Sequence, residues 1–124
     1  MNTEHQIIQQ TVDAFYAKAR ADILIGYHFA RIADFSTHLP RIVAFWELQL
    51  LNSTNYQFVP ALDALRVHIP LRFHRGEIDR WVKLFQETLM EQTMPTEFRE
   101  RWQEKLRHFQ QVFQNSPLLF SSQD

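Results

Sequence analysis

The histidines have the widest chemical range of any residues in this chain, and their spacing excludes several kinds of site. The chain has six of them, scattered rather than clustered, at His5, His28, His38, His68, His74 and His108. It has no cysteine, which excludes disulfides, thiol chemistry and thiolate-bound metals. The sequence also lacks the His-Glu-x-x-His zinc motif, the repeated Glu-x-x-His pairs of di-iron bundles and the Gly-x-Ser-x-Gly turn of acyl-transfer enzymes. No catalytic residue is therefore predicted.

Two histidines, His38 and His68, lie at the ends of predicted helices. His38 falls in the first turn of a helix rich in Phe and Trp, and His68 ends a short helix that Pro70 stops. A helix end gives the His68 ring a fixed direction. The carbonyl of Ala64 or Leu65 can accept its Nδ1–H, which leaves Nε2 free as a metal ligand. The alternative is that both are ordinary helix-end histidines, favoured at His68 by the helix dipole.

The elements that must position these histidines are all predicted to be helices. Thr3 and Gln6 form a capping box that begins the first helix, and its apolar residues recur at helical spacing. The strongest helical patterns cover residues 37–51, 76–91 and 96–114, and weaker ones cover residues 22–32 and 61–68. No segment shows the alternation typical of strands. The fold class is therefore predicted to be all-α, with five to seven helices.

The start of the third helix has three candidate N-caps, Asp34, Ser36 and Thr37. Pro40 is predicted to lie in its first turn, where a missing N–H costs little. Residues 116–124 are predicted to be a frayed tail. The length of 124 residues indicates one domain, residues 1–124.

Charge and composition exclude further classes of protein. Thirteen basic and fourteen acidic residues leave a net charge of −1, without the basic excess of a nucleic-acid or membrane-surface binder. No apolar run is long enough to span a membrane, and the polar N-terminus has no secretion signal, so we expect a cytoplasmic protein. Only two glycines occur against eleven phenylalanines, more than a small helical core usually needs.

The order and spacing of these residues resemble group III truncated haemoglobins, a family of short bacterial globins. The resemblance covers roughly residues 8–89 and lies in short stretches at Phe15-Tyr16, Gly26–Phe29, His38-Leu39 with Ile42, Phe45 and Trp46, His68–Leu71 and Arg80–Phe85. The ordered spacing of five polar aromatic residues is its most specific part: Tyr16, His38, Trp46, His68 and Trp81. The resemblance implies a shortened globin fold, a two-over-two helical sandwich.

The resemblance also implies a haem b cofactor, with His68 as the axial ligand of the iron. The implied distal side consists of Tyr16, His38, Ile42 and Trp81, with Phe29 and Phe45 against the porphyrin. Cationic partners for the haem propionates would come from Arg41 and from Arg72 or Arg75. The surplus of phenylalanine suits a pocket for a large apolar disc, although Phe15, Phe45, Phe85 and Phe109 can equally be ordinary core residues.

The implied function is binding of O2, NO, CO or peroxide at a five-coordinate haem iron, with redox chemistry supplied by an unidentified reductase. Tyr16 and Trp81 each carry one donor that must find a partner if buried, and both could stabilise a charged ligand. The oligomeric state expected is a monomer or weak homodimer. The alternatives are a helical interaction module without haem, which buries its aromatic faces against a partner, and a haem-based sensor. Whether the protein is an enzyme stays open.

Overall fold

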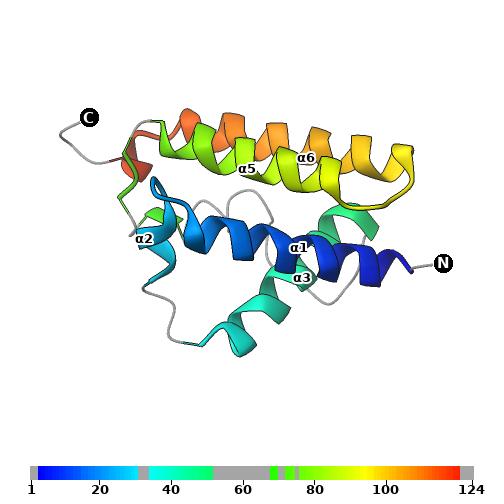
Figure 1. The fold of residues 1–124 in the computed structure, drawn as a ribbon. Coiled ribbons are helices and arrows are strands. Elements are labelled where there is room, and N and C mark those ends of the chain that lie inside the picture. Colours follow the sequence, from blue (N-terminus) through cyan, green and yellow to red (C-terminus); the bar gives the residue numbers. More distant parts are fainter. Residues whose placement is uncertain (1–2, 31–33, 52–67, 70–71, 75, 121–124) are drawn as a thin grey trace.

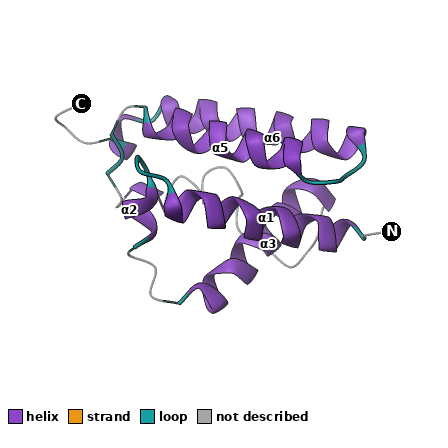
Figure 2. Ribbon diagram, in the orientation of Figure 1, coloured by secondary structure: helices purple, strands orange, loops and turns teal. Residues whose placement is uncertain are grey.

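The computed structural model describes residues 3–30, 34–51, 68–69, 72–74 and 76–120. Its α-helices are α1 (Glu4–Ala21), α2 (Gly26–Phe29), α3 (Phe35–Leu51), α5 (Glu77–Glu91) and α6 (Thr96–Gln114). A single 3-10 turn, Pro117–Leu119, follows α6. The described part of the chain contains no strand, only an isolated bridge between Phe73 and Phe120 (Figure 2). The predicted all-α class is confirmed. No described helix is long and apolar enough to cross a membrane.

The long helices form two pairs, α1 with α3 and α5 with α6 (Figure 1). Helices α5 and α6 lie antiparallel, side by side, and α1 and α3 pack against each other beneath them. The pairs are joined where α1 contacts α5 and where α3 contacts α6. The short α2 sits at the end of α1. This is the two-over-two arrangement that the sequence predicts.

An aromatic cluster fills the space between the two pairs. The ring of Trp46 on α3 lies 5.5 Å from that of Trp102 on α6 and 5.5 Å from that of Phe85 on α5. Phe15 on α1 lies 4.5 Å from Phe85, and Trp102 is fully buried. Part of the phenylalanine surplus therefore does serve an ordinary core. The rings of Phe15, Trp46, Phe85 and Trp102 are buried within the chain itself.

Three helices begin or end close to their predicted bounds. The Thr3 capping box is confirmed: Gln6 donates its backbone N–H to the Thr3 hydroxyl at 3.2 Å, and Thr3 donates its own to the Gln6 side chain at 2.9 Å. Helix α6 has its predicted bounds, and α5 begins one residue after its predicted start, with Gly76 as N-cap. The weaker helical pattern at residues 22–32 predicts the bounds of its helix less well.

The start of α3 differs from the prediction. The helix begins at Phe35, before the predicted residue 37, and the Asp34 carboxylate accepts hydrogen bonds from the backbone and hydroxyl of Ser36 and the hydroxyl of Thr37. Asp34 therefore caps the helix, rather than Ser36 or Thr37. Pro40 becomes the sixth residue, in the second turn, so its predicted place in the first turn is wrong.

The second predicted helix is too long at its start. The Asp22 carboxylate accepts the backbone N–H groups of Leu24 and Ile25 at 3.0 and 3.1 Å, which folds this segment into a turn instead. Helix α2 begins at Gly26, where an added Cβ would meet the carbonyl oxygen of Arg20 at 2.8 Å. Residues 31–32 of the predicted helix lie outside the described residues, as do residues 61–67 of the helix predicted before His68.

The predicted frayed tail is wrong for its first residues. Leu119 is fully buried and Phe120 is 5% exposed, and Phe73 donates its backbone N–H to the Leu119 carbonyl at 2.9 Å. Burial of these two large apolar side chains stabilises the turn by more free energy than the loss of chain entropy costs. The end of the chain is thus fastened beside residues 72–74. Residues 121–124 lie outside the described residues.

Candidate functional site

Tyr16 is the buried polar residue of α1 on the predicted distal side. Its side chain is 6% exposed, and burial raises the pKa of its phenol far above the ordinary value. The phenol is therefore a neutral hydrogen-bond donor at all physiological pH values. Its ring makes edge contacts with Phe29 on α2 at 5.4 Å and with His38 on α3 at 6.0 Å. Three predicted site residues from three helices thus lie together.

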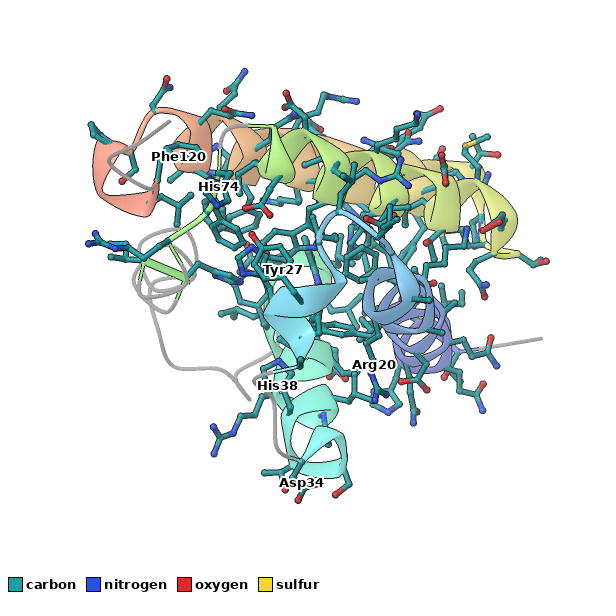
Figure 3. All side chains as sticks on the ribbon, turned by 60° about the vertical axis from the view of Figure 1, so that its left-hand side comes forward. Arg20, Tyr27, Asp34, His38, His74 and Phe120 are labelled. Carbon is teal, nitrogen blue, oxygen red and sulfur yellow. The ribbon has the colours of Figure 1, made fainter. Side chains whose placement is uncertain are left out.

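His38 lies in the first turn of α3, as the sequence predicts, on the more exposed side of this group (Figure 3). Its side chain is half-buried. Burial, and to a lesser degree the charge of Arg41, lowers its pKa below the ordinary histidine value. The ring is therefore neutral at pH 7, which suits a residue that moves between an apolar pocket and solvent.

His68 lies in a different part of the same aromatic region. Its ring centroid is 4.9 Å from that of Trp81 on α5, 5.3 Å from that of Phe113 on α6 and 6.1 Å from that of Phe73. His68 is helical and half-buried. An imidazole fixed on three sides by aromatic rings has few orientations open to it.

Phe15 joins the two groups. Its ring is stacked on Trp81 with centroids 6.4 Å apart, and it makes an edge contact with Tyr16 at 5.4 Å. A continuous series of aromatic contacts therefore runs from His68 through Trp81 and Phe15 to Tyr16. The prediction that Tyr16 and Trp81 hold one ligand together stays a prediction.

The remaining predicted residues line the same region or its edge. Phe29, Ile42, Phe45 and Trp81 are partly buried and pack against the core. Phe45 also contacts Phe109 on α6 at 5.3 Å.

The predicted propionate partners that the structure describes are exposed. Arg41 lies on α3, and Arg72 has a left-handed backbone with φ 54°. That conformation costs about 1–2 kcal/mol for a residue with a Cβ. Arg75 lies outside the described residues.

The sequence missed three aromatic neighbours of the predicted site. For Phe113 the sequence shows only that it lies in the helical pattern of residues 96–114, and for Phe15 only a core position or a place in the resemblance. Phe73 had no signal, because its burial depends on the bridge to Phe120, 47 positions away in the chain. Helical spacing reveals which side of a helix is apolar, but not which residue of another helix will face it.

The arrangement of crossed helix pairs defines a shortened globin fold. The chain matches the crystal structure of the group III truncated hemoglobin from Campylobacter jejuni with a TM-score of 0.80 and 23% sequence identity, covering 99% of this chain and 95% of that chain. No family model and no curated protein matches the sequence. The predicted fold is confirmed by this likeness. What the protein binds has to be argued from its own residues.

Proposed function

We propose that the protein holds haem b and binds O2 and other diatomic ligands at a five-coordinate iron, with His68 as the axial ligand. The observation that carries the proposal is the series of aromatic contacts, on a truncated globin fold, that links the His68 imidazole to the buried phenol of Tyr16. An imidazole and a neutral phenol at the two ends of an apolar cluster are the ligand and the donor that such a site needs.

The chemistry of the residues suits the cofactor. Haem is a large, flat, mainly apolar molecule, and the candidate wall residues Phe29, Ile42, Phe45 and Trp81 are apolar and only partly buried by the chain itself. Covering them would remove further apolar surface from water. The exposed cations Arg41 and Arg72 are available to the propionates at the edge.

The chain's own residues would then determine the fate of the ligand. Haem iron supplies an open axial position for a diatomic molecule. Tyr16, held neutral by burial, donates its O–H to a ligand that carries partial negative charge, and the Trp81 indole N–H acts in the same direction. His38 stands between Tyr16 and the exposed Arg41, where its movement would admit or exclude ligand and water.

Two such donors favour retention of the ligand over rapid exchange. Hydrogen bonds to charged acceptors contribute about 1.5–3 kcal/mol each, so release of O2 should be slow. Slow release suits chemistry on the ligand, including peroxide or NO turnover, better than transport. The proposal includes an unidentified reductase, a cytoplasmic location and a monomer or weak homodimer.

The test is the absorption spectrum of the protein expressed with a haem supply. We expect one haem per chain, a Soret band, and a shift of that band when CO is added to the reduced protein. A well-folded protein that takes up no haem under these conditions would favour a helical protein without the cofactor, and the proposal would fall.

A further inference from the structure

A buried carboxylate lies at the start of α5, outside the group of residues proposed to hold haem. Glu77 is 9% exposed, and it accepts a hydrogen bond from the phenol of Tyr27 on its Oε2 atom. Its Oε1 atom accepts the backbone N–H of His74 at 2.6 Å and lies 3.1 Å from Nε2 of His28. Helix α2 and the start of α5 are thus joined through one carboxylate.

The protonation of His28 follows from its surroundings. His28 is 4% exposed, and among the described residues its Nδ1 atom has no hydrogen-bond partner. A proton on that atom would be a buried donor without an acceptor. Nε2 is therefore the ring atom that donates to Glu77, and this carboxylate accepts hydrogen bonds from both His28 and the Tyr27 hydroxyl.

Aromatic contacts lead from Tyr27 to the proposed axial ligand. The Tyr27 ring lies 4.1 Å from the His28 ring, the His28 ring 4.5 Å from Phe73, and Phe73 6.1 Å from His68. Phe73 also lies 6.0 Å from Trp81. Tyr27 is 47% exposed, so this series of packed rings begins at the surface. Figure 3 shows Tyr27 on the same side of the molecule as His74 and Phe120. His74 follows Phe73 in the chain, and Phe120 is the residue bridged to Phe73.

We propose that Tyr27 is a surface site for one-electron transfer, at which small phenolic or hydroquinone-type donors reduce the haem centre. The inference rests on the proposed haem function and adds the electron donor's place and chemical class. A phenol gives up an electron readily only when a base takes its proton in the same step, and Glu77 is that base. His28 and Phe73 are hard to oxidise, so they serve as the packed medium between Tyr27 and His68.

The electrons and protons balance as follows. Tyr27 would give one electron to haem that peroxide has oxidised, while its phenol O–H bond breaks and its proton passes to Oε2 of Glu77. The resulting phenoxyl radical takes one electron from the donor, and Glu77 returns the proton to the Tyr27 oxygen. The donor loses one electron to the haem and one proton to solvent, and Tyr27 and Glu77 are restored.

The surface around Tyr27 suits an aromatic donor. Ile23 is 92% exposed and Leu24 is 55% exposed, and both precede Tyr27 in the turn between α1 and α2. Large apolar side chains at such exposure offer a contact for a flat, weakly polar molecule.

The test uses the haem-loaded protein, peroxide and a nitroso spin trap, with the adduct located by mass spectrometry and the radical observed by electron paramagnetic resonance. We expect a tyrosyl signal and an adduct on Tyr27. Tyr27→Phe keeps the ring and should abolish both. Glu77→Gln keeps the shape but removes the base, and loss of a charge-assisted hydrogen bond should lower the adduct yield about tenfold. Tyr56→Phe makes the same chemical change at another tyrosine and should leave the Tyr27 adduct unchanged.

The outcomes separate this inference from the function on which it rests. A normal Soret band with the adduct on Tyr16, Tyr56 or Trp81, and none on Tyr27, would overturn the surface site while leaving haem binding intact. An unchanged tyrosyl signal in Tyr27→Phe would do the same. A protein without a Soret band would overturn the proposed function itself.

Discussion

Replacing Tyr16 with Phe removes one hydroxyl from the candidate ligand pocket and leaves the ring in place. The ring makes edge contacts with Phe15, Phe29 and His38, all of which Phe can retain. The side chain is 6% exposed, so the substitution changes little of the solvent-exposed surface. The perturbation is therefore close to the removal of one hydrogen-bond donor.

The expected magnitude follows from the charge of the ligand. A hydrogen bond to a charged acceptor contributes about 1.5–3 kcal/mol, and each 1.4 kcal/mol corresponds to about a factor of ten. O2 release should therefore become about ten- to a hundredfold faster. Release of CO, which carries little charge when bound, should change much less. Because burial raises the pKa of Tyr16, the effect should persist in alkaline buffer up to about pH 10, where an ordinary tyrosine begins to ionise.

The assay is stopped-flow release of O2 and of CO from four proteins: wild type, Tyr16→Phe, Trp81→Phe and the double variant. If both donors serve one ligand, the two single effects on O2 should fail to add. Equal O2 release in wild type and Tyr16→Phe would show that the hydroxyl serves the protein interior, and its role toward the ligand would have to be withdrawn.

Three further predictions concern the access route and the fold. His38→Ala should change the rate of CO association more than haem affinity, and equal CO association rates in the two proteins would contradict a role of His38 in ligand access. Arg41→Gln should raise the pKa of His38 in an NMR titration, because it removes a repelling charge. It should reverse only part of the lowering of this pKa, because burial is the larger cause. Asp22→Ala should cost about 1–3 kcal/mol in urea unfolding, and because hydrogen bonds hold the pKa of Asp22 below its ordinary value, the loss should shrink as pH falls below about 4. Phe120→Ala should cost about 3 kcal/mol, against about 0.5 kcal/mol or less for the exposed Met90→Ala; a full-stability Phe120 variant would mean that the end of the chain is frayed after all.

The helices could be predicted from the sequence because each carries its own local signals. The Thr3 capping box and the apolar spacing of residues 96–114 depend only on neighbours along the chain. Where several local signals competed, the sequence left the choice open: Asp34, Ser36 and Thr37 are all candidate N-caps, and the structure uses Asp34. Asp22 likewise forms a turn because its carboxylate bonds backbone groups that a helix would have used.

The candidate site could be predicted in part, through residue types at characteristic intervals. Tyr16 contacts Phe29 and His38, and the His68 ring contacts that of Trp81, while the roles that the resemblance gives these residues stay predictions. The spacing of residues along the chain does not predict the contacts between segments that are distant in the sequence.

The hydrogen bond from Tyr27 to Glu77 shows why. It joins residues 50 positions apart, and nothing in the sequence around either residue points to the other. Such pairs are set by how the helices cross, which periodicity does not encode.

The most direct test of the central claim is haem titration of wild type and His68→Ala, followed by Soret absorption and resonance Raman of the reduced proteins. We expect wild type to bind one haem with an iron–histidine stretch, and His68→Ala to lose that stretch and most of its affinity, with both restored by added imidazole. His38→Ala, the matched histidine control, should keep the stretch. A His68→Ala protein that retains a normal five-coordinate spectrum and the iron–histidine stretch would show that His68 is not the axial ligand.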